Sequence, residues 1–401
     1  MLLRNLTLRN FRNYAGQDII FNPRFNFIHG NNGEGKTNIL EAVSFVSYGR
    51  SFLGSAEADC VRFESDDFDV SGVYENEIGN LYDVSAGYIK SLKKKTIRLN
   101  KEKVNRYSTE IFGKFPVVFL SPHSLNITYG NPAERRKFFD MLIAQTSRLY
   151  LDLLKDMVRV LKQKNALLKN QLASKAYSRE DFMNLLETYN KSLSKLSSEI
   201  VYRRLRFLEE FIVYFRKSFG FLMAADDEPC IDYDSELFDE GKPMKFQVSG
   251  IPAPDEIKRK YEDMMKLRSG LEISRGVSLV GAHRNDYLFT LRKKGSFTGG
   301  SVEFGLKNFA SQGEHKTFVI ALKLAEYHFL KDKLGNSPLL LLDDLLSELD
   351  HGRVSKIVSH LMDYGQIFLT ATDLTYDNEL KRFYGSNEIS YFNVTAGKVK
   401  S

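Results

Sequence analysis

The stretch that decides the fold lies near the N-terminus and reads Gly30-Asn31-Asn32-Gly33-Glu34-Gly35-Lys36-Thr37. It matches the phosphate-loop pattern G-x-x-x-x-G-K-[ST], in which glycines let backbone N–H groups converge on phosphate oxygens without a Cβ in the way. A strand-like run, Phe25 to Ile28, precedes it, and apolar residues at helical spacing follow from Thr37 to Val46. Because the motif requires a strand before it and a helix after it, the sequence predicts a nucleotide-binding P-loop in an α/β fold.

Each residue type in this loop has an expected role toward ATP and Mg²⁺. We expect Lys36 to contact the β- and γ-phosphates and the Thr37 hydroxyl to ligate magnesium. The helix that starts near Lys36 adds the positive end of its dipole. A chance glycine-rich turn is the alternative, and the strand and helix on either side disfavour it. The predicted nucleotide-binding residues of the loop are Gly30, Asn31, Asn32, Gly33, Glu34, Gly35, Lys36 and Thr37.

A second motif supplies the acids that such a loop needs. Pro338 to Leu342 is apolar throughout, which is typical of a strand buried on both faces, and Asp343 and Asp344 follow it directly. We expect Asp343 to hold Mg²⁺, directly or through water, and Asp344 to orient or deprotonate the attacking water. Many ABC-type ATPases use the longer glutamate there, so slow hydrolysis is expected. The alternative is a helix N-cap pair. The predicted catalytic residues are Lys36, Asp343 and Asp344.

The residues from Phe309 to Glu314 precede a strongly apolar helical stretch, Phe318 to Leu330. Ser311 and Gly313 are expected at the helix N-terminus, aimed at a γ-phosphate that is held by the P-loop of another copy. An ordinary N-cap is the alternative, but the position upstream of Asp343 favours an ABC signature. Ser347 to Asp350 stands at the spacing of the D-loop, which crosses the dimer interface.

Charge permits a nucleic-acid partner. The 401 residues favour two lobes, and 57 basic against 51 acidic residues give a net charge of +6. Clustering matters more than the sum, and the cluster of Lys93, Lys94, Lys95 and Arg98 is the best candidate for contacts with a DNA backbone. The alternative is a solvated surface. No base-reading motif is visible, so we expect recognition of DNA structure rather than sequence.

Other features exclude whole classes of protein. No apolar run approaches the roughly 20 residues that span a bilayer, so no membrane partner is expected. The start, Met1 to Asn5, turns polar at once and lacks the apolar core of a signal peptide. Cys60 and Cys230 lie far apart and fit no metal spacing, which favours a reducing cytoplasm over a disulfide framework.

The order of patterns predicts two lobes. Short strands up to about Asn100 include a hairpin that displays the lysines, and long helices follow from about Tyr150 to Phe219. A turn at 173–177 and a capping box of Ser178 with Asp181 divide these helices into an antiparallel hairpin. The acidic stretch 224–256 is predicted to be a loop or an insertion. We predict an ATPase lobe I at 1–105 and 275–401, and a mostly helical lobe II at 106–274.

Taken together, the motifs resemble the RecF family of bacterial recombination proteins over essentially the whole chain. The P-loop alone is unspecific, but the set in this order is specific. The matching stretches are Leu8 to Tyr14, the P-loop through Asn38, Pro132 to Asp140, Leu161 to Asn165, Gly281 to Asp286, Ser311 to Gly313, and Leu341 to Asp350.

The resemblance implies a globular ABC/SMC-type head with a short helical second lobe and ATP-dependent homodimerisation. It implies binding to single-stranded or gapped DNA and to junctions, and partnership with RecO and RecR, which load RecA. Roles in repair, replication and the SOS response follow, in the bacterial cytoplasm near the nucleoid. A weak, DNA-stimulated ATPase that acts as a switch fits this picture better than a metabolic enzyme.

The chain departs from the family pattern at a few positions that bear on ATP-driven dimerisation. In place of an ABC switch histidine, the sequence offers Thr370 or Thr372. Glu314, His315 and Lys316 stand where the family usually has Gln-Gln-Arg. His123 and Ser124 stand where the family tends to carry acidic residues, and Ala282 and Asn285 stand where it has Pro and Asp.

Other P-loop proteins remain as alternatives. An ABC transporter cassette would carry Leu-Ser-Gly-Gly-Gln and a switch histidine, and it needs a membrane partner. An SMC-like structural DNA-binding ATPase would insert a coiled coil of hundreds of residues. A soluble P-loop kinase would need neither the Ser311 motif nor the Ser347 to Asp350 segment.

Overall fold

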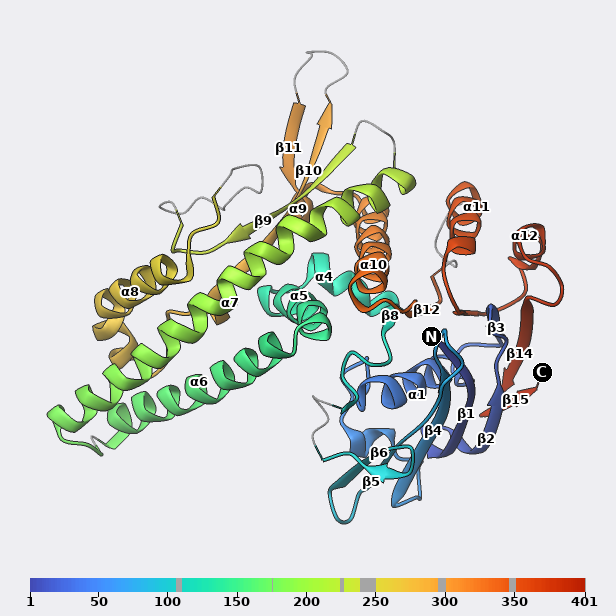
Figure 1. The fold of residues 1–401 in the computed structure, drawn as a ribbon, viewed down its shortest axis with the longest axis horizontal. Helices are drawn as coiled ribbons and strands as arrows, with labels where there is room; N and C mark the ends of the chain where they lie inside the picture. Colours follow the sequence, from blue (N-terminus) through green and yellow to red (C-terminus); the bar gives the residue numbers. More distant parts are fainter. Residues whose placement is uncertain are drawn as a thin grey trace. The chain divides into compact units, whose positions relative to one another are not determined.

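The computed structural model describes residues 1–105, 110–174, 176–223, 227–238, 250–294, 301–345 and 351–400. The chain divides into two compact units, which are treated separately below (Figure 1). Unit 1 consists of Met1–Leu125, Phe221–Met223 and Lys316–Ser401, and unit 2 of Asn126–Gly220 and Ala224–His315.

These bounds differ from the predicted lobes 1–105 with 275–401 and 106–274. Strand β10 (Asp286–Lys294) pairs with β9 (Asp227–Asp234) along its length, so the segment up to His315 belongs with the helical unit. Strand β8 (Val117–Leu120) pairs with the strand Leu339–Asp343 of unit 1. The segment 106–125 therefore belongs to unit 1 and not to the helical unit. The prediction that 224–256 is a loop was wrong for 227–234, which form β9.

The central sheet of unit 1 has the strand order β15-β14-β3-β13-β12-β8. Its inner strands pair in parallel, and all residues of β12 and β13 are buried, as their continuous apolar runs predict. The buried strand predicted at 338–342 is therefore confirmed. Besides β8, the strands of this sheet are β3 (Phe25–His29), β12 (Leu339–Asp343), β13 (Ile367–Ala371), β14 (Ile389–Thr395) and β15 (Lys398–Lys400).

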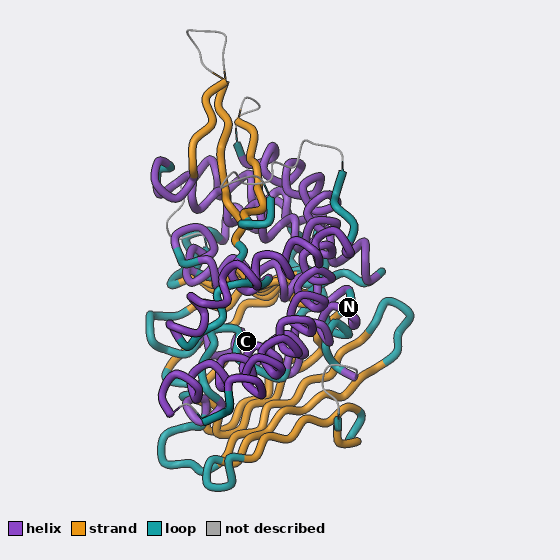
Figure 2. The backbone as a smooth tube through the Cα atoms, turned by 90° about the vertical axis from the view of Figure 1, so that its left-hand side faces the viewer, coloured by secondary structure: helices purple, strands orange, loops and turns teal. Residues whose placement is uncertain are grey.

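A second, antiparallel sheet of unit 1 has the order β2-β1-β4-β5-β6-β7, and its long strands lie side by side in Figure 2. Buried and partly buried residues alternate along β4, because one face of this sheet meets the core. The strands are β1 (Leu2–Phe11), β2 (Tyr14–Ile20), β4 (Asp67–Glu75), β5 (Leu81–Ile89), β6 (Lys94–Leu99) and β7 (Glu102–Lys103).

Helix α1 (Lys36–Tyr48) contacts strands of both sheets, and its buried side chains form part of the hydrophobic core of unit 1. Its Phe45 meets Phe11 of β1 and Phe68 of β4 edge to face, with ring centroids 5.5 and 5.2 Å apart. The two sheets therefore fix both faces of the helix that follows the P-loop. The other helical segments of this unit are α2 (Glu57–Cys60), η1 (Pro122–Leu125), α11 (His351–His360), η5 (Leu361–Asp363) and α12 (Asp377–Phe383).

Unit 2 is mostly helical, with a three-stranded sheet of order β11-β10-β9. Helices α6 (Arg148–Ser174) and α7 (Arg179–Leu222) run side by side in Figure 1 and share a core of Leu167, Leu168, Phe182 and Leu186. The predicted antiparallel hairpin is thus confirmed. The remaining elements are α4 (Asn126–Tyr129), α5 (Pro132–Thr146), α8 (Pro254–Arg275), η3 (Ala282–Arg284), β11 (Ser301–Gly305) and α9 (Leu306–Phe309).

The capping box predicted at the start of α7 is also present. Ser178 Oγ accepts a hydrogen bond from the Asp181 backbone N–H at 3.1 Å and donates one to its carboxylate at 2.7 Å. Helix α10 (Gln312–Leu334) begins in unit 2 and continues in unit 1. None of the helices in the described ranges combines the length and apolar character that a membrane span requires.

A buried guanidinium ties together several elements of unit 2. Arg204 of α7 is fully buried and donates to both carboxylate oxygens of Asp140 on α5, at 2.9 and 2.8 Å. It also donates to the Tyr150 hydroxyl of α6 at 3.1 Å and to the Ala282 carbonyl of η3 at 2.8 Å. Removing the cation would leave the mostly buried Asp140 carboxylate without its positive partner, which is costly.

We therefore expect Arg204→Met to lower the free energy of unfolding by about 3–5 kcal/mol. The matched control is Arg206→Met, two residues along the same helix, where the side chain is 55% exposed and pairs with Glu209. That exposed pair should be worth less than about 1 kcal/mol. Urea unfolding followed by circular dichroism measures both, and equal losses from the two variants would contradict the assignment.

Candidate nucleotide-binding site

The P-loop lies between β3 and α1, where the sequence places it. Two of its glycines cannot be replaced without a clash. A Cβ at Gly30 (φ 149°) would lie 2.2 Å from the Val394 carbonyl oxygen, and one at Gly35 (φ 114°) would lie 2.6 Å from the Asn13 side chain. The loop therefore needs glycine for close packing against its neighbours as well as for its backbone angles.

Contacts from distant parts of the chain hold the loop in place. Asn13, in the turn between β1 and β2, donates to the Glu34 carbonyl at 2.7 Å and accepts from the Asn38 amide at 2.9 Å. The Gly397 N–H also donates to the Glu34 carbonyl, at 3.2 Å, and the Ala396 N–H donates to the Glu34 carboxylate. The Glu34 side chain, a predicted nucleotide contact, is thus directed at the β14–β15 turn.

Lys36 lies folded back onto its own loop. Its ammonium donates to the Gly30 carbonyl at 2.6 Å and to the Asn31 carbonyl at 2.9 Å. Burial lowers the pKa of Lys36, and the charges of Asp344, Asp343 and Glu34 partly oppose this. Among the described residues, no side chain caps the N-terminus of α1, and no acidic residue stands in its first turn. The loop thus presents a cation and a helix N-terminus to one small region, which suits a phosphate.

The predicted metal site is built from Thr37, Asp343 and a residue that the sequence did not assign. The Thr37 hydroxyl lies 3.0 Å from each carboxylate oxygen of Asp343, and the Thr370 hydroxyl donates to the same carboxylate at 2.7 Å. The Asp343 side chain ends a strand and is buried. Burial raises the pKa of Asp343, and both threonine hydroxyls counteract it. A carboxylate beside hydroxyl oxygens is the donor set that Mg²⁺ prefers.

Asp344 occupies a special backbone position. It has a positive φ of 49°, and its N–H donates to Thr370 Oγ1 at 3.0 Å. Thr370 therefore bridges the two acids, whereas Thr372, the other candidate for the switch position, is exposed. The parallel pairing of Asp343 with Thr370 across β12 and β13 explains this contact, and it could be found only once the strand order was known.

Ser311 and Gly313, the residues of the predicted ABC signature, lie at the start of α10. Ser311 and Gln312 are exposed at the start of α10, and Phe309 beside them is 73% exposed. Ser311 and Gly313 belong to unit 2, whereas the P-loop and Asp343 belong to unit 1. The predicted D-loop, Ser347 to Asp350, lies outside the described residues.

The predicted DNA-binding cluster lies on the β5–β6 hairpin. Lys93 stands at the turn with a φ of 46°, and Lys94, Lys95 and Arg98 follow on β6. Lys95 pairs with Glu57 at 2.6 Å, while Lys93, Lys94 and Arg98 are exposed. The hairpin therefore displays most of its positive charge to solvent, as the sequence predicts.

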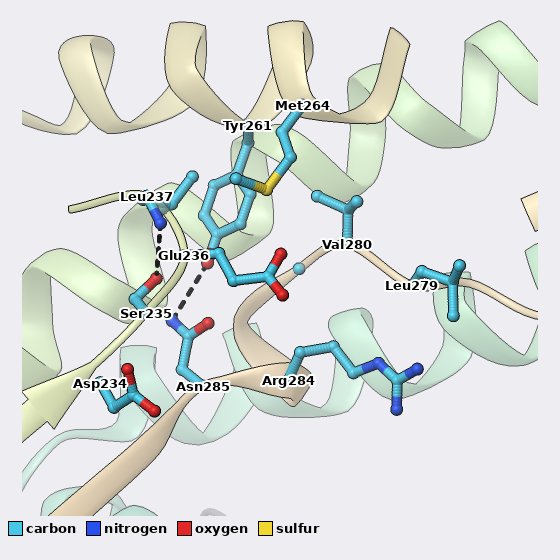
Figure 3. A pocket seen from close by; sticks show the side chains of 11 residues that line it. Asp234, Ser235, Glu236, Leu237, Tyr261, Met264, Leu279, Val280, Arg284 and Asn285 are labelled. Carbon is cyan, nitrogen blue, oxygen red and sulfur yellow. Dashed lines mark hydrogen bonds between the residues drawn. The ribbon is translucent and has the colours of Figure 1, made fainter. Parts of the chain in front are cut away.

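The stretch Gly281 to Asp286 is part of the interior of unit 2 and borders a cavity of about 130 Å³ (Figure 3). Arg135 holds Asp286 through two hydrogen bonds, at 2.8 and 2.7 Å. Asn285 donates to the hydroxyls of Tyr233 and Tyr261, at 2.9 and 3.2 Å. Glu236 at the cavity edge pairs with Arg268 at 2.9 Å. These residues hold the helices and the sheet of unit 2 together, and none of them belongs to the P-loop.

His283 in this stretch gives unit 2 a measurable response to acid. Burial lowers the pKa of His283 from 6.5 to about 4, reinforced by Arg284, Arg136 and Lys164 and opposed by the Ser278 backbone. Between these values the unfolded chain binds more protons than the folded one, so the free energy of unfolding rises with pH.

We expect the wild type to lose about 2 kcal/mol more unfolding free energy than His283→Gln between pH 7.5 and pH 5.0. Urea unfolding at the two pH values measures this difference. Comparing the two losses cancels other titrating groups and any direct cost of the substitution. Equal losses would mean that His283 does not titrate with a lowered pKa.

The comparisons with known proteins agree with this geometry. A family model described as the RecF/RecN/SMC N terminal domain matches residues 2–389. With its P-loop, its buried strand ending in Asp343 and its mixed sheets, the chain has the fold of an ABC/SMC-type ATPase head.

Similarity to individual proteins shows to which family of ABC/SMC-type ATPases the chain belongs. The DNA replication and repair protein RecF of Chloroherpeton thalassium is 34% identical over 95% of this chain and 98% of its own length. RecF of Ruminiclostridium cellulolyticum is 30% identical over the full length of both chains. A solved structure of the recombination mediator protein RecF with ATPrS, in the RecFOR pathway, has a TM-score of 0.82 at 28% identity, covering 99% of this chain and 97% of that one. The chain belongs to the RecF family of DNA replication and repair proteins.

Proposed function

We propose that this chain is an ATP-controlled DNA-binding protein of recombinational repair and replication, in which ATP drives dimerisation and hydrolysis is slow. The observation that carries the proposal is the cluster of Thr37, Asp343 and Thr370 beside the P-loop, in a chain of the RecF family. A RecF relative has been solved with ATP, which supports ATP as the nucleotide.

The residues of the loop have distinct tasks in this proposal. Lys36 leaves the carbonyls of Gly30 and Asn31 and turns to the phosphates, while the N–H groups at the start of α1 hold the oxygens. Thr37 and Asp343 hold Mg²⁺, which when bound neutralises charge on the phosphate oxygens. Asp344 orients the attacking water, and Thr370 fixes its backbone.

Dimerisation follows from the proposed task of Ser311 and Gly313. The residues proposed for the far side of the γ-phosphate, Ser311 and Gly313, stand at an exposed helix start beside the exposed Phe309. A second copy supplies them, so that loss of the γ-phosphate removes contacts from both copies and the dimer opens. A full reversal from monomer to dimer needs roughly 5.5 kcal/mol of differential affinity.

DNA is proposed to lie against the basic hairpin. The exposed side chains of Lys93, Lys94 and Arg98 suit phosphate groups rather than bases, so binding should respond to salt and to DNA structure. Single-stranded or gapped DNA and junctions are the proposed substrates, with RecO and RecR as partners in loading RecA. An SMC-like structural role is less favoured, because α6 and α7 form a short hairpin of 27 and 44 residues.

The experiment that tests the proposal is the mass of the protein in solution. Sedimentation velocity should give a monomer without nucleotide, a dimer with ATP, and a larger complex when gapped DNA is added. Phosphate release should rise when DNA is present. A mass that ATP leaves unchanged would contradict the switch, and DNA binding that ignores ATP would contradict the proposed control.

A further inference from the structure

The first turn of α10 carries a closed capping box that contains a carboxylate. Ser311 Oγ accepts from the Glu314 backbone N–H at 3.3 Å. In return, Glu314 Oε2 accepts from the Ser311 backbone N–H at 2.7 Å and from the Ser311 hydroxyl at 2.8 Å. This is the reciprocal S-x-x-E arrangement, and here it also engages the hydroxyl proton of the serine.

The second oxygen of the same carboxylate is held by a cation. Glu314 Oε1 accepts from the Lys293 ammonium, which comes from β10 of the same unit. Burial alone would raise the pKa of Glu314, but the hydrogen bonds from Lys293 and Ser311 outweigh it and lower the pKa to about 2. The carboxylate is therefore ionised at any pH at which the protein works.

This arrangement conflicts with the task proposed for Ser311. A helix N-terminus attracts an anion through its free N–H groups and its dipole, and a serine hydroxyl adds one further donor. Here a protein carboxylate already takes the Ser311 hydroxyl proton and stands at the start of the helix. A phosphate that approached the same hydroxyl would meet a fixed negative charge, and like charges at short range repel.

We propose that Glu314 is a positioning residue that holds Ser311 in a self-capped state, which the terminal phosphate of a nucleotide on a second copy must displace. The inference rests on the proposed function, because it concerns the regulation of the same Ser311 contact. Lys293 holds the carboxylate from the other side and offsets its charge, so that the displaced Glu314 keeps a partner. The capping box thus sets the threshold for ATP-driven dimerisation.

The proposal predicts opposite effects from two substitutions. Glu314→Gln keeps the shape of the side chain and removes its charge, and each symmetric dimer contains the contact twice. The dissociation constant of the ATP-bound dimer should therefore fall roughly tenfold. Lys293→Met leaves the carboxylate without its cation and should raise the dissociation constant several-fold. In the Glu314→Gln background, Lys293→Met should raise the dissociation constant less than it does in the wild type, because Lys293 no longer has a charged carboxylate to hold away from the phosphate.

Sedimentation equilibrium with saturating ATP measures these constants, and ATP affinity is measured separately on the monomer, where no change is expected. The matched control is Glu303→Gln, which removes a carboxylate of unit 2 that pairs with Arg292 at 3.2 Å. It should leave dimerisation as it is. A merely structural cap predicts the reverse order, since glutamate near a helix N-terminus stabilises the helix more than glutamine does.

The outcomes separate the two proposals. If the wild type dimerises with ATP and Glu314→Gln dimerises equally or more weakly, the role of Glu314 is overturned and the ATP switch stands. If neither protein dimerises with ATP, the ATP switch fails and the role of Glu314 fails with it. A stronger dimer for Glu314→Gln and a weaker one for Lys293→Met support both.

Discussion

Replacing Ser311 with arginine is expected to leave ATP binding intact and to abolish ATP-driven dimerisation. The side chain is exposed at the start of α10, and the proposal assigns it to the nucleotide of a second copy, so the proposed nucleotide contacts of its own copy keep all their residues. On the partner's side, the larger side chain would fill the place proposed for the γ-phosphate contact. We expect the dimer dissociation constant to rise at least roughly a hundredfold, the counterpart of a lost hydrogen bond to a charged group in each of the two nucleotide sites of the dimer.

Equilibrium dialysis with labelled ATP and sedimentation velocity give the two readouts for Ser311→Arg. Ser274→Arg, at an exposed position in the last turn of α8, makes the same substitution elsewhere in unit 2 and should dimerise normally. Loss of ATP binding in Ser311→Arg would show that Ser311 acts on the nucleotide of its own copy. The assignment to a second copy would then be wrong.

Replacing Lys36 with alanine is expected to weaken ATP binding strongly and, at ATP concentrations that just saturate the wild type, to abolish ATP-driven dimerisation. Its ammonium is the cation of the loop, and a charge-assisted bond to phosphate contributes about 1.5–3 kcal/mol, which corresponds to roughly ten- to a hundredfold in affinity. Without bound nucleotide there is nothing for the second copy to contact, so the dimer is lost as well. Dialysis and sedimentation again give the two readouts.

The matched control for Lys36→Ala is Lys398→Ala, on the exposed edge of β15. It removes the same charge from unit 1 and should leave both properties unchanged. Lys36→Arg adds a second test, because the larger planar group does not fit the two carbonyls at 2.6 and 2.9 Å. Normal dimerisation of Lys36→Arg with ATP would argue against the sandwich of two nucleotides.

Local patterns in the sequence predicted those parts of the site that depend on neighbouring residues. The glycines of the loop, the helix after it and the buried strand before Asp343 are each set by residue type and spacing within a short window, and the structure has them where predicted. The capping box of Ser178 and Asp181 belongs to the same group. The roles of Asp343 and Asp344 remain predictions.

The parts that depend on strand order were not predictable. Thr370 reaches Asp343 because β12 and β13 pair in parallel, and Asn13 and Ala396 reach the P-loop from the two ends of the chain. The bounds of the units were misplaced for the same reason, since the partner of β10 is a distant strand. One signal was overlooked: Ser311 and Glu314 match the S-x-x-E capping pattern as clearly as Ser178 and Asp181 do.

The most direct test of the central claim is a mixing experiment with two inactive variants. At an ATP concentration that just saturates the wild type, Lys36→Ala keeps Ser311 but its own loop stays largely empty, and Ser311→Arg binds ATP but cannot contact a partner's nucleotide. A mixed pair contains one complete site, and its second site holds no phosphate for the introduced arginine to disturb. If two copies share each site, mixing should restore ATP-dependent dimers and phosphate release that neither variant has alone. If each copy works by itself, the mixture will show only the sum of its two inactive parts.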